Sequence, residues 1–321
     1  MNLGKTFLYG LALSGLVFTS CKKEEPTPPT PDPTAPSSTP SAQDLGNYFD
    51  QNLQNEVEPF TIDATSISSF STSDGSQFNF PANAFETSNG TQVTGMIDVQ
   101  VVELLDKRDM LLTNKPTMGN IPGGGRAPLI SGGEFRVTAS QNGNDLQLKD
   151  GVGYNLTVPA GNNGIDPNMN LFFGSSNGDT LSWNEVDSAS VWGQNGFYET
   201  YFDSLNWVNL DYFMDSTGNN TTVQVELPAG FDNSNCMLYV SFDGMNSLAN
   251  LYNYQNGAFT TAPYYTLPIG MDVHFVAISY INGDPHTAIV PATISNSHYE
   301  VIPALNQTTV AQFESDVNAL P

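Results

Sequence analysis

Short strand-like segments, separated by turn residues, recur along most of the chain. In residues 76–80 and 133–139 apolar and polar side chains alternate, which is the pattern of a strand with one buried face. The pairs Asn142-Gly143, Asn256-Gly257 and Asn282-Gly283 are signals for tight turns. Many short strands joined by turns about every 8–12 residues predict an all-β sandwich or barrel.

The expected strands form two groups. In the first group, strands are expected at residues 76–80, 93–105, 133–139 and 154–158. A long loop is expected at 113–131. The second group has the same pattern of short strands and turns, but its sequence does not repeat that of the first. Its strands are expected at 171–174, 197–202, 207–212, 222–227, 237–242, 248–254, 273–280 and 287–294. We therefore predict two β-sandwich-like units, at residues 43–160 and 161–321.

Two segments have helical periodicity. Leu45, Phe49 and Leu53 are spaced by four, which predicts a short helix over residues 44–53. Near the C-terminus, Thr309 followed by Gln312 has the pattern of a capping box. A short C-terminal helix is expected there, with an apolar face made of Val310, Phe313, Val317 and Leu320.

The N-terminus carries a targeting signal. Lys5 precedes an apolar run over residues 7–18, and small residues lead to Cys21. This order is typical of a secretory signal peptide, here residues 1–20, because a membrane span needs about 20 apolar residues.

The sequence Phe18-Thr19-Ser20-Cys21 resembles the bacterial lipobox, with Phe18 where leucine is usual. The resemblance implies cleavage before Cys21 and acylation of Cys21 with chains such as palmitate, and two or three chains give a lasting anchor. Lys22 in place of aspartate implies the outer membrane. Lys23, Glu24 and Glu25 resemble the surface-export signal of Bacteroidota lipoproteins. The alternative is an ordinary signal peptide with an incidental cysteine.

Residues 21–42 would follow the signal as a linker. The segment 26–40 is rich in proline, threonine and serine, so it has too few apolar side chains to form a core and is expected to be an extended spacer.

The chain has few charged residues, and most of them are acidic. The chain has 9 Lys and Arg against 33 Asp and Glu, a formal net charge of −24. No lysine or arginine follows Lys149. Such a surface repels nucleic acid, anionic membranes and acidic polysaccharides. The acids are interpreted either as solubilising in a salty medium or as ligands for a divalent cation.

Only two cysteines occur. With Cys21 acylated, Cys236 is left alone, so no intramolecular disulfide is expected in the mature protein. Cys236 lies in an apolar strand-like run, which predicts a buried, unreactive thiol.

Residues 56–160 resemble the ZU5-like β-sandwich of Bacteroidota surface lipoproteins. The resemblance is carried by GSQFNFPANAFETSNGTQVTGMIDVQVVE and by NKPTMGN followed by LISGGEFRVTASQNGNDLQLKDG. It implies an interaction module and supplies no catalytic residues.

No sequence motif for catalysis is present. The nucleophile elbow, the phosphate loop, the dinucleotide glycine fingerprint and the zinc-protease helix are all missing from the sequence. The three histidines, His274, His286 and His298, are too widely spaced for a zinc knuckle. We therefore expect no catalytic residue and no cofactor.

The tryptophans are the strongest binding candidates. Trp183, Trp192 and Trp207 fall within 25 residues, and Tyr212 follows them closely. Exposed aromatic rings bind sugar faces, whereas buried ones fill a core. Trp207 is expected in the core, although the alternation from Trp207 to Tyr212 places Trp207 on the less apolar face.

Weaker signals remain. Six lysines and arginines lie within residues 107–149, which predicts either a docking surface or a mixed solvated face.

Calcium candidates are Asp211, Asp215 and Asp232, in loops whose Asp and Asn also suit ordinary turns. A pattern that resembles Bacteroidota O-glycosylation, Asp followed by Ser or Thr and a small or aliphatic residue, occurs at Thr180, Ser188, Ser204 and Ser216.

Together these features predict a lipid-anchored protein of the outer-membrane surface that is not an enzyme. Adhesion, scaffolding or contact with other envelope proteins is the first expectation. Binding of neutral glycans by the segment 183–207 is the alternative, and an envelope hydrolase with an unrecognised carboxylate site is the third.

Overall fold

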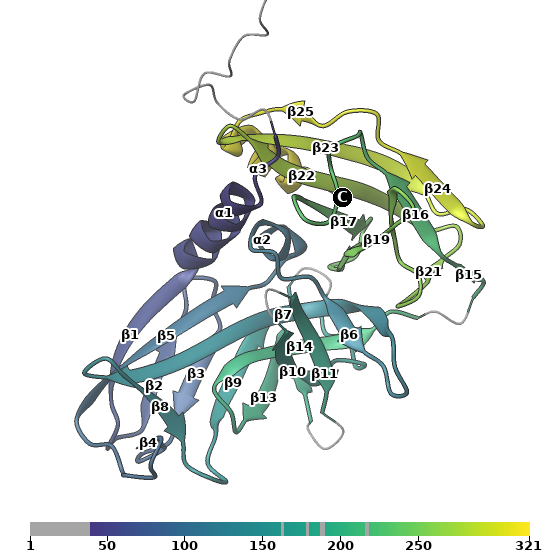
Figure 1. Ribbon diagram of the computed structural model, residues 1–321. Coiled ribbons are helices and arrows are strands. Elements are labelled where there is room, and N and C mark those ends of the chain that lie inside the picture. Colours follow the sequence, from purple (N-terminus) through teal and green to yellow (C-terminus); the bar gives the residue numbers. More distant parts are fainter. Residues whose placement is uncertain (1–38, 162–163, 178–179, 187–189, 216–217) are drawn as a thin grey trace, which may run out of the picture. The chain divides into compact units, whose positions relative to one another are not determined.

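Strands make up most of the fold, and the predicted all-β class is confirmed. The computed structural model describes residues 39–321 except for 162–163, 178–179, 187–189 and 216–217. These residues lie within one compact unit. Figure 1 shows two of the short helices, α1 and α2, between the strands at the bottom of the view and those at the top. The predicted lipidation and export residues Cys21, Lys23, Glu24 and Glu25 lie outside the described residues.

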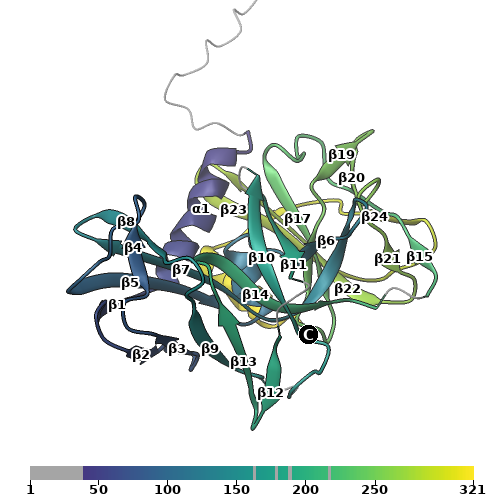
Figure 2. The same ribbon diagram turned by 90° about the horizontal axis from the view of Figure 1, so that it is seen from below.

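The strands up to Phe213 form two sheets that enclose the first hydrophobic core. The larger sheet follows the order β1 (Val57–Asp63), β5 (Met96–Leu104), β7 (Arg126–Gln141), β14 (Asn206–Phe213), β10 (Asn170–Asn177), β11 (Thr180–Glu185) and β6 (Met118–Asn120), with a branch formed by β4 (Phe85–Thr87) and β8 (Asn144–Leu148). The smaller sheet follows the order β12 (Trp192–Gln194), β13 (Phe197–Phe202), β9 (Tyr154–Pro159), β3 (Gln77–Phe80) and β2 (Ser68–Ser71), and Figure 2 shows these five strands side by side.

Five strands of the larger sheet close on themselves. β7 pairs with β14, β14 with β10, β10 with β11, β11 with β6, and β6 again with β7. We call this part the closed sheet. Its interior is narrow, since a Cβ atom added at Gly174 would lie 2.5 Å from the Cβ of Trp207. The interior is filled by a small core of Leu129, Phe172, Leu181 and Trp183.

The strands after residue 217 form three further sheets around a second core. One has the order β18 (Leu248–Asn250), β17 (Cys236–Phe242), β22 (Asp272–Ile281), β23 (Asp284–Thr293) and β25 (Asn306–Gln307). Another has the order β19 (Asn253–Gln255), β20 (Ala258–Thr260), β16 (Val223–Glu226) and β24 (His298–Val301), and β15 (Asn220–Thr221) pairs with β21 (Leu267–Pro268).

A third core joins the helices to both groups of strands. It contains Leu45 and Phe49 of α1 (Ala42–Asn55), Met110 of α2 (Lys107–Leu112) and Phe313 of α3 (Val310–Asn318). The helix expected at 44–53 is confirmed as α1, and the C-terminal helix as α3. The Thr309 hydroxyl accepts the Gln312 N–H as expected, but the Gln312 side chain donates to Asp316 instead of closing a capping box.

The turn predictions are confirmed, whereas one loop prediction and one strand prediction are wrong. Asn256 and Gly257, like Asn282 and Gly283, have positive φ angles at the tips of hairpins. The loop expected at 113–131 contains β6 and the start of β7, which pair across a glycine turn. The strand expected at 248–254 is two strands, β18 and β19, because the chain changes sheet after Asn250.

The predicted boundary between residues 160 and 161 does not separate one set of sheets from another. β9 and β13 lie on either side of that point and are neighbours in one sheet. β7 and β14 are likewise neighbours in the other. The strands of the first two sheets therefore extend to Phe213.

Candidate functional site

The aromatic residues that the sequence singles out lie in four different environments. Trp183 belongs to the core of the closed sheet and has no exposed surface. Its indole N–H donates to the carbonyl oxygen of Pro116 at 3.3 Å. A fully buried ring has no face left for a sugar, so Trp183 has a structural role.

Trp207 lies half-buried at one end of the closed sheet. Its neighbours Val208 and Leu210 belong to the first core, so Trp207 points to the opposite side of β14, where its ring meets Trp183. The Nζ of Lys115 lies 5.8 Å from the centroid of the Trp207 ring, and the Cζ of Arg136 lies 5.5 Å from it. Cations over an aromatic ring are attracted by its electrons, and here they occupy space that a stacked sugar would need.

Trp192 is the exposed member of the set. It opens β12 at the edge of the five-stranded sheet, and 59% of its surface is exposed. Tyr201 on the neighbouring strand β13 is 45% exposed. Tyr201 is not recognisable as a site residue from the sequence, because its exposure depends on which face of β13 packs on the core.

The strand register aligns Trp192 with a row of polar side chains across all five strands. Trp192 lies opposite Glu199, Glu199 opposite Thr157, Thr157 opposite Gln77 and Gln77 opposite Ser71. Because directly opposed residues share a face, these five side chains point to the same side of the sheet. The row therefore runs across the whole width of the sheet, on the face that is turned away from the core.

A second row lies beside the first. It runs from Tyr201 through Asn155 and Asn79 to Ser69. All four side chains are exposed, while their chain neighbours Phe78, Leu156 and Phe202 are fully buried. We call the two rows together the polar sheet face. A shallow hollow of about 230 Å³ lies over its β2, β3 and β9 part.

The polar sheet face has little charge. Glu199 is its single ionisable carboxylate, and the amide of Gln194 donates to that carboxylate at 2.9 Å. The other side chains are hydroxyls, amides and the two aromatic rings. The surface therefore offers neutral hydrogen-bond donors and acceptors beside flat apolar rings.

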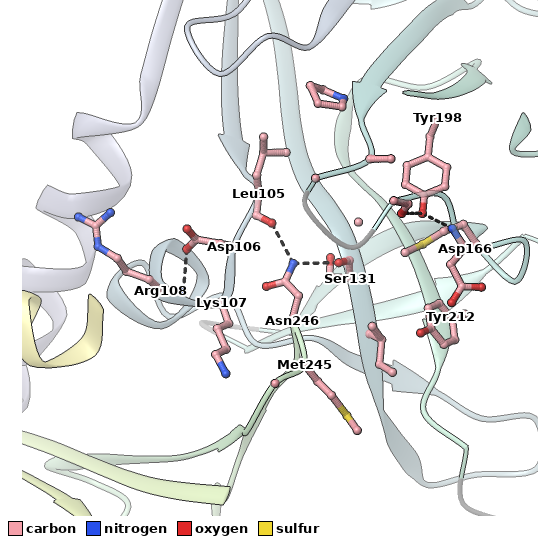
Figure 3. A pocket seen from close by; sticks show the side chains of 18 of the residues that line it. Leu105, Asp106, Lys107, Arg108, Ser131, Asp166, Tyr198, Tyr212, Met245 and Asn246 are labelled. Carbon is pink, nitrogen blue, oxygen red and sulfur yellow. Dashed lines mark hydrogen bonds between the residues drawn. The ribbon is translucent and has the colours of Figure 1, made fainter. Parts of the chain in front are cut away.

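Another cavity lies elsewhere, and Tyr212 lines it together with Asp166 and Tyr198 (Figure 3). Its volume is about 610 Å³. Burial, with the Asp166 carboxylate nearby, raises the pKa of Tyr212 to about 12. The Tyr198 hydroxyl accepts the Asp166 backbone N–H at 2.7 Å and donates to the Gly164 carbonyl at 3.3 Å.

The other polar groups of this cavity also bond within the protein. The Asn246 amide donates at 2.8 Å to the carbonyl oxygens of both Leu105 and Ser131, as Figure 3 shows. Lys107 donates to the carbonyl oxygens of Phe242 and Pro321. These bonds hold neighbouring segments together and leave few groups that point to a ligand, so we do not take this cavity as the candidate site.

The calcium candidates are in unrelated places. Asp211 has no exposed surface, and its carboxylate accepts the Asn209 amide at 2.5 Å. Asp215 is exposed. Asp232 accepts the N–H and hydroxyl of Ser234, which closes a local turn and lowers the pKa of Asp232. Over the described parts of the chain, no three His, Cys, Asp or Glu side chains come together to hold a metal ion.

Asp211 is close to a second buried acid, Glu134. Both project from paired strands of the closed sheet and neither has exposed surface. Both oxygens of Glu134 and Oδ1 of Asp211 have no hydrogen-bond partner among the described residues. Burial raises the pKa of each carboxyl well above its usual range, and for Glu134 the charge of Asp211 adds to the rise while Lys115 opposes it.

The predicted glycosylation positions are described only in part. Ser188 and Ser216 lie outside the described residues, and so does the side chain of Thr180, whose backbone opens β11. Ser204 is exposed in the turn between β13 and β14, and its hydroxyl donates to the Leu205 carbonyl. Cys236 is buried, which raises the pKa of its thiol to about 12.

No protein-family model matches the chain, and no curated protein matches it. None of the helices in the described residues is long and apolar enough to cross a membrane.

Proposed function

We propose that this chain is a lipid-anchored, non-enzymatic protein of the outer-membrane surface that binds a neutral glycan on its polar sheet face. The lipobox-like segment ending at Cys21 supports the location. The ZU5-like resemblance of residues 56–160 supports a binding role. The single observation that carries the ligand class is the alignment of Trp192 and Tyr201 with two rows of neutral polar side chains.

The chemistry of the polar sheet face suits a sugar chain. Sugar rings carry hydroxyls, which both donate and accept hydrogen bonds, and C–H faces, which pack on flat aromatic rings. Asn and Gln side chains supply donors and acceptors together, as do Ser and Thr hydroxyls. Tryptophan and tyrosine supply an apolar face with a polar edge. Five strands about 4.8 Å apart give a width of about 19 Å, which is long enough for several sugar units.

Charge favours a neutral glycan over an acidic one. The chain has a net charge of −24, and the polar sheet face has Glu199 but no lysine or arginine. An acidic polysaccharide approaching this face would meet repulsion from the whole molecule with no local cation to offset it. A neutral chain meets neither effect.

A hydrolase is less well supported at this face. Hydrolysis of a glycosidic bond ordinarily uses two carboxyl groups about 5–10 Å apart. Glu199 is the only one on the polar sheet face. The buried pair of Glu134 and Asp211 has no exposed surface and lines neither of the two cavities described above.

The test is binding of the mature chain to an array of neutral polysaccharides, followed by calorimetry on those that bind. Trp192→Ala and Tyr201→Ala should each weaken binding about tenfold or more, because aromatic anchors carry most of the binding energy at such surfaces. Their stability should change little, since both rings are exposed. Tyr299→Ala is the matched control, because Tyr299 is 52% exposed on the distant strand β24.

Two results would contradict the proposal. One is that no neutral polysaccharide binds while an acidic one does. The other is that Trp192→Ala and Tyr201→Ala bind as well as Tyr299→Ala, which would place the glycan on another surface.

A further inference from the structure

A separate cavity of about 440 Å³ lies at the Trp207 end of the closed sheet. Trp207 and Leu181 of the closed sheet line one side, and Leu45 and Phe49 of α1 line another. Lys115 and Arg136 also line it. The lining is about equally divided between apolar and polar side chains, and placed polar groups of this kind fix the orientation of a bound molecule.

The hydrogen-bond donors of the Arg136 side chain are unused within the described residues, as are those of Arg126. The Arg136 guanidinium carries five N–H donors, yet it has no hydrogen bond or ion pair with any described residue. The chain has 33 acids for 9 bases, so a lack of carboxylates cannot explain this. Arg136 is half-buried on β7, and burial holds the pKa of its guanidinium below the usual range, although arginine stays charged at neutral pH.

The surroundings hold Arg136 in place. Its Cζ lies 5.5 Å from the centroid of the Trp207 ring, on the strand directly paired with its own. Lys115 lies near the same ring and donates to the Thr113 carbonyl at 3.3 Å. Two cations therefore stand beside one aromatic ring in a chain that is otherwise acidic.

Acids are sparse in the lining. Asp50, exposed on α1, is the only carboxylate among the described residues that line the cavity. The buried Glu134 lies on β7 two residues from Arg136, and its raised pKa favours the neutral form. The described lining of the cavity thus has a local excess of positive charge beside the apolar side chains of one part of it.

We propose that this cavity binds a small molecule carrying an oxyanion, a carboxylate or phosphate group, which the Arg136 guanidinium holds beside Trp207. The planar guanidinium matches both groups with two parallel hydrogen bonds. The apolar side chains of α1 and Leu181 contact the body of the ligand. This site is distinct from the polar sheet face and does not depend on glycan binding there.

Three related sugars test the proposal at equal ionic strength. Glucuronate carries a carboxylate, glucose 6-phosphate carries a phosphate, and glucose carries neither. Calorimetry on the mature chain with the Trp192→Ala substitution, which removes the glycan anchor proposed above, should show binding of one or both anions and none of glucose at the same concentration. The two anions distinguish a carboxylate site from a phosphate site. Equal binding of glucose and the anions would overturn the proposal.

Variants place the binding in the cavity. Arg136→Gln should weaken anion binding about tenfold, because a hydrogen bond to a charged group is lost. Arg136→Lys should retain part of the affinity, since it keeps the charge but loses the fork geometry. Arg126→Gln is the matched control, because Arg126 also stands over an aromatic ring, with its Cζ 5.0 Å from the Tyr252 centroid, and lies outside this cavity.

The Asp50→Asn variant distinguishes a direct effect on anion binding from an effect of misfolding. It removes the one lining carboxylate on the exposed side of α1 and should strengthen anion binding about twofold. A damaged fold would not produce a gain. Unchanged affinity in Arg136→Gln, or an equal loss in Arg126→Gln, would overturn the assignment to Arg136.

Discussion

Trp183 and Trp207 meet edge to face, with their ring centroids 6.3 Å apart and their planes at 81°. They project from β11 and β14, which are not neighbours but are both strands of the closed sheet. Trp183 is completely buried, whereas Trp207 is half-buried at the opening. One ring therefore packs inside the closed sheet while the other covers its end.

The buried tryptophan should be the important one for stability. Trp183→Ala should lower the free energy of unfolding by about 3–5 kcal/mol, because it leaves a cavity among Leu129, Phe172 and Leu181. Trp207→Ala should cost less, and Trp192→Ala should change stability by no more than about 0.5 kcal/mol. Urea unfolding of the three variants measures this order. A loss for Trp192→Ala as large as that for Trp183→Ala would contradict it.

Local sequence patterns predicted the individual helices and strands of this fold better than they predicted which strands pair with one another. The alternation of Phe78 and Phe80 with polar residues marks β3, and the Asn-Gly pairs mark the hairpin tips. The closed sheet could not be predicted, because β6 is three residues long and its pairing with β11 rests on the single parallel pair of Trp183 and Gly119. α2 was also missed, since six residues are too few for a helical period, although Asp106 caps its start and Met110 and Leu111 pack into the third core.

The same limit applies to the binding surfaces. Trp192 could be named from the sequence, but the row that aligns it with Thr157 and Gln77 joins segments far apart in the chain. Alternation placed Trp207 on the less apolar face of its strand. That face turned out to be half-buried, because it lines the closed sheet and packs against Trp183. Strand alternation gives the face of a residue but not what covers that face.

The cap of α1 gives a second prediction. The Ser41 hydroxyl accepts the Asp44 backbone N–H at 3.2 Å. Ser41→Ala should lower the free energy of unfolding by about 1 kcal/mol, because that N–H at the helix start loses its partner. Ser41→Asp, which keeps an acceptor, is the control and should remain near the original stability. Equal urea midpoints for Ser41→Ala and the original chain would show that the cap contributes nothing.

Salt should stabilise the protein without a specific effect of calcium. No lysine or arginine follows Lys149, so the carboxylates beyond it repel one another at low ionic strength. The described residues contain no group of three ligands that could hold a metal ion. We therefore expect sodium chloride and calcium chloride at equal ionic strength to raise the melting temperature equally. A much larger rise with calcium would indicate a specific oxygen site.

The anchor gives a prediction for cells. Cys21→Ala should abolish incorporation of labelled palmitate and release soluble or unprocessed protein, because the lipobox-like segment ends at this cysteine. Cys236→Ala is the control, since its buried thiol should not affect labelling. Label that persists in Cys21→Ala would show that the chain is not a lipoprotein.

The buried acids predict how stability depends on pH. The pKa values of Glu134 and Asp211 are raised in the folded protein, whereas in the unfolded chain such groups titrate near pH 4. Above that pH the folded state therefore binds more protons than the unfolded state. The stability that these groups contribute is fully present below about pH 4 and falls as the pH rises.

Glu134→Gln removes one of these titrations and keeps the shape of the side chain. Its stability relative to the original protein should therefore increase from pH 5 to pH 8, by up to about 1.4 kcal/mol for each pH unit. Asp63→Asn is a control of opposite sign, because hydrogen bonds from Thr65 lower the pKa of Asp63 in the folded protein. That variant should lose stability relative to the original protein above about pH 4 and match it in acid. Parallel curves for Glu134→Gln and the original protein would mean that Glu134 keeps the same charge throughout this range.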